Sequence, residues 1–159
     1  MQKQNLIRLG DVAYVEVGES TADHDDYMTG ACFSAGLIPL PRALPGEDPD
    51  EYAHRILGLV SARDQSFPLL GGMLMPAGTK PEEWTRKMAT ETEAHLRGLR
   101  SPEDRAAIRR QIVEMLIPFF EDGIAKLLSS RTSSPARESD PASDLAPAGT
   151  AVGEISSVH

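Results

Sequence analysis

Chemically capable side chains are densest at Asp23, His24, Asp25 and Asp26, which are consecutive and precede Cys32, the only cysteine of the chain. A thiol becomes a nucleophile when a base such as His accepts its proton. A small Cys-dependent enzyme using Cys32, His24 and Asp26 is therefore one interpretation, provided that a loop brings the thiol and the imidazole together. The small and apolar residues that flank Cys32 are more typical of core packing, so we expect a buried, inert cysteine.

The same acidic stretch raises the possibility of a metal site, because carboxylates bind hard cations and His binds zinc. Side chains of consecutive residues in an extended loop alternate in direction, so only about two or three of the four would reach one ion. The calcium-loop pattern of acids around a central Gly is absent, and Cys32 is a weak second zinc ligand. We expect a solvated acidic loop whose Asp caps a segment beginning near Tyr27, with no metal, cofactor or catalytic residue.

A cluster of five arginines makes one region basic in a chain whose formal net charge is −8. Its members are Arg97, Arg100, Arg105, Arg109 and Arg110. Such a cluster can bind phosphate or an acidic protein surface, or it can pair with the acidic N-terminal third. Glu103 and Asp104 interrupt it, and no aromatic residues are interleaved for base stacking, so we do not expect nucleic-acid binding. A solvated helical face is the simplest interpretation.

Composition narrows the class of protein. A length of 159 residues suits one domain with a real core, and one cysteine fits a reducing compartment. The sequence has no apolar run long enough for a signal peptide or a membrane span. Common phosphate-loop, dinucleotide, zinc-protease and serine-hydrolase motifs are missing. We therefore expect a cytoplasmic protein without membrane contact, and a binding or assembly role rather than catalysis.

Three segments carry helix-start signals. Asp48 is a predicted N-cap, followed by Pro49 and by Glu51 at the capping-box spacing. The second helix is predicted to begin at Pro81, after Thr79 or Lys80.

The third helix is predicted to begin at Pro102, capped by Ser101. Pro118 should kink or end it, because proline removes a backbone donor and clashes with the preceding turn. A short helical piece over residues 119–128 would then follow.

The N-terminal part is predicted to contain a β element, either one strand over Val12 to Val17 or a hairpin around Gly10 and Asp11. Residues 27–40 fit a helix or a buried strand equally well. Residues 66–78 contain a Gly71–Gly72 pair and are interpreted as a loop or turn with exposed or half-buried Leu and Met. The predicted fold class is α+β: a mainly helical single domain with a small N-terminal β hairpin or strand.

The chain is predicted to divide into a compact α+β domain, residues 1–128, and a disordered tail, residues 129–159, rich in Ser, Ala and Pro. Such a segment buries too little apolar surface to offset its ordering entropy. It is either a passive tail or a docking strand anchored by Val152 and Ile155.

One stretch, residues 81–123, has the sequence PEEWTRKMATETEAHLRGLRSPEDRAAIRRQIVEMLIPFFEDG. This stretch, with a β segment before it and a polar extension after it, resembles the small tail assembly chaperones of long-tailed bacteriophages in pattern. The resemblance implies a non-catalytic protein that coats an elongated apolar tape-measure protein and delivers tail-tube subunits.

These observations predict a non-catalytic cytosolic adaptor or assembly chaperone whose partner is a protein, with an elongated helical or tube-forming protein as one form. Its expected contact surface includes Met73, Leu74, Met75, Trp84 and Met88. Core packing is the alternative role for all five, and it is the favoured one for Trp84. Apolar side chains of this kind can shield apolar helices from aggregation. A virion structural subunit with a wrapping C-terminal tail is an alternative, and a homo-oligomer is also open.

Overall fold

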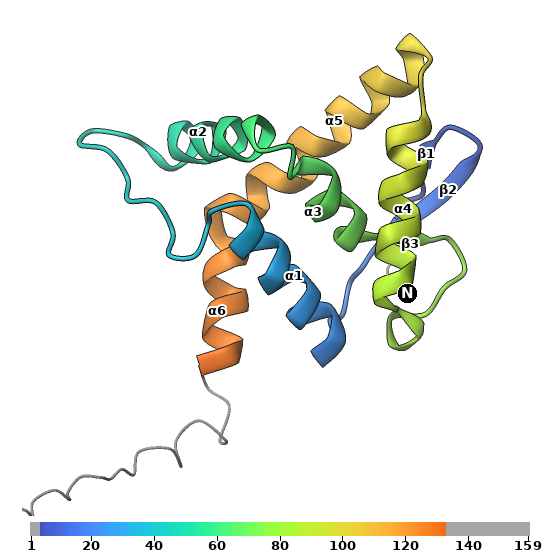
Figure 1. Cartoon of the computed structure of the whole chain (residues 1–159), viewed down its shortest axis with the longest axis horizontal. Helices are drawn as coiled ribbons and strands as arrows, with labels where there is room; N and C mark the ends of the chain where they lie inside the picture. The colour runs from blue at the N-terminus through green and yellow to red at the C-terminus, as the bar shows by residue number, and fades with distance from the viewer. Residues whose placement is uncertain (1–3, 133–159) are drawn as a thin grey trace, which may run out of the picture. The chain divides into compact units, whose positions relative to one another are not determined.

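The computed structural model describes residues 4–132 and is mainly helical, with a small antiparallel sheet (Figure 1). This confirms the predicted α+β class. The elements are β1 (Ile7–Leu9), β2 (Val12–Glu16), α1 (Ala22–Ser34), α2 (Pro49–Ala62), α3 (Ser66–Met73), β3 (Leu74–Pro76), the 3-10 turn η1 (Pro81–Glu83), α4 (Arg86–Gly98), α5 (Pro102–Pro118), the π-helical turn η2 (Phe119–Gly123) and α6 (Ile124–Thr132). Within the described range, no helix has the length and apolar character needed to cross a bilayer.

The sheet has the order β1-β2-β3, and both strand pairs are antiparallel. Leu9 pairs with Val12, so a two-residue turn of Gly10 and Asp11 closes the hairpin. Gly10 has a φ of 68°, and Gly at the first turn position with positive φ is the pattern of a type II′ hairpin. The hairpin alternative is therefore confirmed, whereas β3 was not predicted.

The start signals of α2 and α5 act as predicted. The Asp48 carboxylate accepts from the Glu51 amide at 2.9 Å, and the Glu51 carboxylate accepts from the Asp48 amide at 3.1 Å. Ser101 Oγ accepts from the Asp104 amide at 3.0 Å. Each contact satisfies a backbone donor that the helix itself leaves without a partner.

Pro118 ends α5, as predicted, and η2 follows it. Helical structure then continues through α6 to Thr132, so residues 129–132 are helical rather than part of the predicted tail. Contacts divide the chain into two units, Met1–Ile124 and Ala125–His159. The remaining tail prediction, with its anchors Val152 and Ile155, falls outside the described residues.

The predicted start of the second helix at Pro81 is wrong. Residues 81–83 form only η1, and Trp84 then adopts an extended ψ of 134°. Thr85 is the true cap of α4, since its Oγ accepts from the Met88 amide at 3.3 Å. Trp84 is only 3% exposed, so its insertion into the core interrupts a helix that the local signals alone would begin earlier.

The acidic stretch is also different from the prediction, because it forms the first turns of α1 rather than a loop. Thr21 caps this helix, its Oγ accepting from the His24 amide at 3.3 Å. Asp23 and Asp25 lie in the first turn, where carboxylates are favoured by the positive end of the helix dipole.

The predicted loop over residues 66–78 is instead α3 followed by β3. Two consecutive glycines cost a helix roughly 1 kcal/mol each relative to Ala. They are tolerated because neighbouring elements approach closely: a Cβ on Gly71 would lie 2.8 Å from the Ala89 carbonyl oxygen of α4. A Cβ on Gly72 would lie 2.5 Å from the Tyr27 ring of α1.

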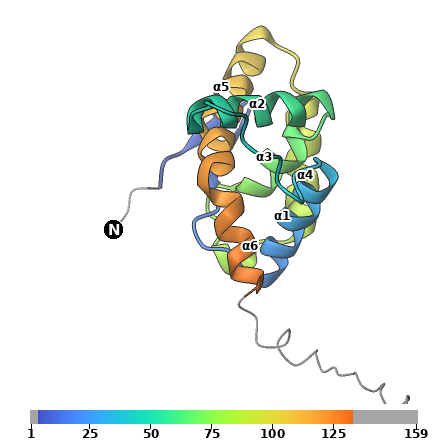
Figure 2. The ribbon, with the colours of Figure 1, turned by 90° about the vertical axis from the view of Figure 1, so that its left-hand side faces the viewer.

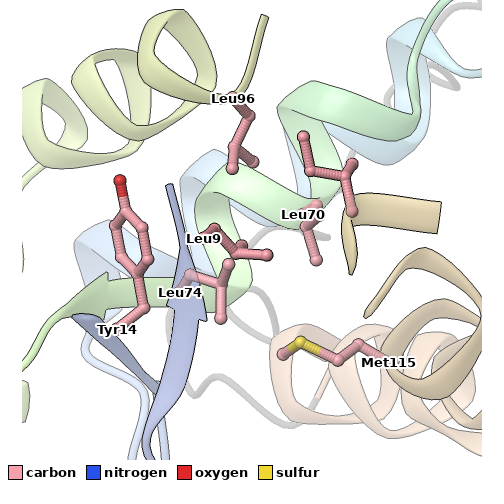
Figure 3. Packing of buried hydrophobic residues seen from close by; sticks show 7 residues of the cluster. Leu9, Tyr14, Leu70, Leu74, Leu96 and Met115 are labelled. Atoms are coloured by element: carbon pink, nitrogen blue, oxygen red, sulfur yellow. The ribbon is translucent and has the colours of Figure 1, made fainter. Parts of the chain in front are cut away.

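The core lies where the sheet meets α3, α4 and α5. Its main cluster, drawn as sticks in Figure 3, comprises Leu9, Tyr14, Leu70, Leu74, Leu96, Ile108 and Met115. A second cluster comprises Val15, Met75, Trp84 and Ala89. Adjacent strand residues enter different clusters because successive side chains of a strand point to opposite faces. Helix α2 lies beside α5 in both ribbon views (Figures 1 and 2).

Candidate functional site

The predicted contact surface is largely interior. Leu74 and Met75 are fully buried and Trp84 is 3% exposed, so the prediction that these three present a surface is wrong. Met73 and Met88 are half-buried. For Leu74 and Met75 the cause is the unpredicted strand β3, which places Leu74 in the main core cluster and Met75 in the second. A role in partner binding stays a prediction for Met73 and Met88 only.

Cys32 and His24 do not form a nucleophile–base pair. Both lie on α1, eight residues apart, and a rise of 1.5 Å per residue separates them by about 12 Å along the helix. Cys32 is fully buried, and this burial raises the pKa of its thiol to about 12. The thiol is therefore protonated at neutral pH, as expected for a cysteine that serves as a small core residue.

His24 has a structural contact instead. Its Nε2 lies 2.8 Å from the Gly72 carbonyl oxygen, which can only accept, so this nitrogen carries the proton. The His24 ring meets Trp84 edge to face, with centroids 4.9 Å apart. Among residues 4–132, no three His, Cys, Asp or Glu side chains gather in a way that could hold a metal ion. His24 thus ties α1 to the end of α3.

A groove of about 460 Å³ lies between α3, α4 and α5. We call it the arginine groove. Its lining is Ser61, Asp64, Ser66, Phe67, Leu96, Arg97, Leu99, Arg105, Ile108, Arg109 and Ile112. Apolar side chains from three helices form its floor, and arginines stand among them. The groove is thus both apolar and cationic, a combination that suits an amphipathic anion.

Arg97 forms a fixed wall of the arginine groove. Its Nη1 donates to both carboxylate oxygens of Asp64, at 3.1 and 3.0 Å, and its Nε donates to Glu93 at 2.9 Å. The guanidinium also lies 4.8 Å from the centroid of the Phe67 ring, within cation–π range. Desolvation lowers the pKa of Arg97, but the hydrogen bonds to the two carboxylates outweigh it and raise the pKa overall. Its charge is therefore already matched inside the chain.

Asp64 holds this wall from an unusual backbone conformation. It has a φ of 56°, and it is the sole non-glycine residue with positive φ among the described residues. Asp adopts the left-handed region more readily than most residues because its short polar side chain can hydrogen-bond locally. The conformation lets the α2–α3 connection present the carboxylate to Arg97.

Arg105 and Arg109 are the available charges of the groove. They lie one helical turn apart on α5, both are exposed, and neither makes an ion pair with any residue between 4 and 132. Ile108 follows Arg105 by three positions, and Ile112 follows Arg109 by three, so α5 has a charged row beside an apolar row. Three arginines and one aspartate give the lining a net positive charge in a chain whose net charge is −8.

The structure brings together three of the five predicted arginines. Arg97, Arg105 and Arg109 line the groove, whereas Arg100 and Arg110 are exposed and do not. Sequence reasoning missed the apolar floor because Phe67 was assigned to a loop. The three- and four-residue spacing of Arg and Ile on α5 is the signal that could have indicated the groove.

Two of the groove's three walls, α4 and α5, come from the segment 81–123 whose pattern was singled out in the sequence. The third wall comes from α3 and the connection before it. Comparisons of this chain with protein-family models, curated proteins and solved structures find no match. What the chain binds must therefore be inferred from the chemistry of the groove.

Proposed function

We propose that this chain is a non-catalytic adaptor or assembly chaperone that binds another protein in its arginine groove. The observation that carries the proposal is the pairing of an apolar floor with Arg105 and Arg109, whose charges have no ion-pair partner among residues 4–132. Phe67, Leu99 and Ile112 are the half-buried part of this floor, and accessible apolar surface rimmed by polar groups is typical of interaction sites. Arginine is also enriched where protein interfaces gain most of their energy.

A protein partner fits this surface better than a nucleic acid does. The accessible part of the floor consists of Phe67, Leu99 and Ile112, and these side chains gain free energy when apolar side chains rather than phosphates cover them. Proteins that bind single-stranded nucleic acids use several aromatic side chains on which the bases stack. Phe67 is the only aromatic residue in the lining of the groove, and the Arg97 guanidinium already covers its ring.

The buried thiol supports binding rather than covalent catalysis. Cys32 is fully buried and lies on α1, outside the lining of the arginine groove. Its raised pKa leaves little thiolate to attack a substrate. A role in phage tail assembly, with a tube-forming or elongated helical partner in the cytoplasm, is the specific form of the proposal. It derives from the pattern of residues 81–123 and from the single cysteine.

The test is co-purification from the native host with the groove charges reversed. The groove variant carries Arg105→Glu and Arg109→Glu, and the matched control carries Arg100→Glu and Arg110→Glu. Both variants change the net charge equally, and all four positions are exposed. We expect the wild type and the control to retain one protein at near-stoichiometric amounts, and the groove variant to lose it. Equal retention by all three forms, or no retained protein, would overturn the proposal.

A further inference from the structure

The spacing of the groove's side chains identifies the kind of partner segment that it accepts. Resting on the function proposed above, we propose that the occupant of the arginine groove is a short amphipathic acidic helix of a partner protein. Its apolar side chains cover the floor, and two of its carboxylates bind Arg105 and Arg109.

The first support is charge complementarity. The Asp64 and Glu93 carboxylates already hold Arg97, so an incoming anion would meet Arg105 and Arg109. Guanidinium binds carboxylate through two parallel hydrogen bonds, so Arg105 and Arg109 are suited to hold acidic side chains. At physiological salt the Debye length is about 8 Å, so charges of the chain that lie farther than this from the groove have little effect on an anion bound there.

The second support is the match between helical repeats. Residues four apart on a helix have Cβ atoms about 5–6 Å apart, which is the spacing of Arg105 and Arg109. Two acidic residues one turn apart on another helix have the same spacing. Beside the arginine row, the half-buried Ile112 offers apolar surface, whereas Ile108 is only 3% exposed and forms the base of the groove. A partner helix with neighbouring acidic and apolar rows would therefore place its carboxylates on the arginines and its apolar side chains over Ile112, Leu99 and Phe67.

The third support is size. A volume of about 460 Å³ accommodates a few large apolar side chains, and it lies within the range of roughly 300–1,000 Å³ usual for binding pockets. The Phe67 ring and the Leu99 side chain provide apolar contact from α3 and from the end of α4. A short helical segment with two or so inserted side chains fills this space, as in helix-in-groove recognition.

The probe is a fluorescein-labelled, alanine-based helical peptide whose Glu and Leu residues repeat the spacing of the arginines and isoleucines on α5. Binding is measured by fluorescence anisotropy with the full chain. Two matched peptides replace every Glu by Gln or every Leu by Ser. A labelled single-stranded oligonucleotide tests the competing class of ligand. Raising the ionic strength from about 0.1 M to about 1 M shortens the Debye length from about 10 Å to about 3 Å and tests the electrostatic contribution.

The protein variants use a milder change than charge reversal. The groove variant carries Arg105→Gln and Arg109→Gln, and the matched control carries Arg100→Gln and Arg110→Gln. We expect wild type and control to bind the acidic peptide alike, and the groove variant to bind about tenfold more weakly because two charge-assisted contacts are lost. Both substituted peptides and high salt should also weaken binding. Thermal unfolding should be unchanged in both variants, since none of the four side chains makes an ion pair within residues 4–132.

Several outcomes would overturn the acidic-helix proposal: equal binding by the groove variant and the control, equal binding of the Gln peptide, or groove-dependent binding of the oligonucleotide without the peptide. The two proposals fail in different ways. A native partner that is retained through the groove but not displaced by the acidic peptide rejects the acidic helix and leaves the adaptor function intact. A peptide bound in the groove without any native partner rejects the adaptor function.

Discussion

Gly71 and Ala89 place the backbones of α3 and α4 in direct contact. A Cβ on Gly71 would lie 2.8 Å from the Ala89 carbonyl oxygen and 3.3 Å from the Glu93 amide nitrogen. Neither atom can move without shifting a whole helix, because both belong to the backbone of α4. The glycine therefore sets the separation of two of the walls that line the arginine groove.

Replacing Gly71 by Ala is expected to destabilise the protein by about 1–3 kcal/mol, because the added methyl overpacks the contact between α3 and α4. The measurement is urea-induced unfolding followed by the fluorescence of Trp84, the single tryptophan.

The matched control for Gly71 is Gly58→Ala. Gly58 lies inside α2, and no atom beyond its chain neighbours and the adjacent backbone of α2 comes within 4 Å of where its Cβ would be. This change should stabilise the protein by roughly 0.4–1 kcal/mol, as expected for an unhindered helical glycine. A Gly71 variant as stable as the Gly58 variant would show that α3 and α4 are not in backbone contact.

The neighbouring methionines Met73 and Met75 should respond differently to replacement by Ser. Met75 is fully buried in the second core cluster, so Met75→Ser should cost at least about 2 kcal/mol through a cavity and a buried hydroxyl. Met73 is half-buried at the rim of the main cluster, so Met73→Ser should cost only about 1 kcal/mol. Thermal and urea unfolding of the two single variants give the comparison. Equal losses would contradict the burial difference.

The Cys32 thiol should be inert in the native protein. Burial raises its pKa to about 12, and the side chain is fully buried, so neither thiolate nor access is available to a thiol reagent. Reaction with Ellman's reagent should be negligible under native conditions and complete in denaturant. Because the chain has one cysteine, the signal reports this site alone. Rapid native reaction would reopen the enzyme interpretation.

The Glu47–Arg55 pair should make stability pH-dependent in acid. Arg55 donates to both Glu47 carboxylate oxygens, at 2.7 and 2.9 Å. The hydrogen bond from Arg55, with that from the Leu44 amide, lowers the pKa of Glu47 from its ordinary value of 4.5 to about 2. As the pH falls, the unfolded chain takes up this proton at a higher pH than the folded chain does. The contribution of the Glu47–Arg55 pair to stability is therefore complete above pH 4.5 and is lost as the pH falls toward 2.

The measurement for this pair is the difference in urea midpoint between wild type and Glu47→Gln as a function of pH. The difference should be constant above pH 4.5 and should shrink toward zero near pH 2. An unchanging difference over that interval would show that the carboxylate is not held by Arg55. Glu19→Gln is a control for general acid effects, because it changes an exposed carboxylate outside α2 that makes no ion pair with any residue between 4 and 132.

Local sequence signals were sufficient to predict where a helix begins when a side-chain cap sets that end. Asp48 and Ser101 start their helices as predicted because a capping hydrogen bond spans only three residues. Pro118 ends α5 for an equally local reason, its missing amide and bulky ring. The Gly10–Asp11 turn also needs only its own two residues to reverse the chain. These local features, together with composition, are enough to predict the α+β class.

Tertiary contacts decided the rest. The Gly71–Gly72 stretch is helical only because α1 and α4 pack against it, and no pattern within residues 66–78 carries that information. Trp84 delays the start of α4 because its ring is buried between elements distant in sequence. The arginine groove is likewise a product of packing: the cluster of arginines was visible in the sequence, but only the meeting of α3, α4 and α5 places Arg97, Arg105 and Arg109 around one apolar floor. Spacing along one helix is a local property, whereas the apposition of three helices depends on the burial of side chains far apart in the chain.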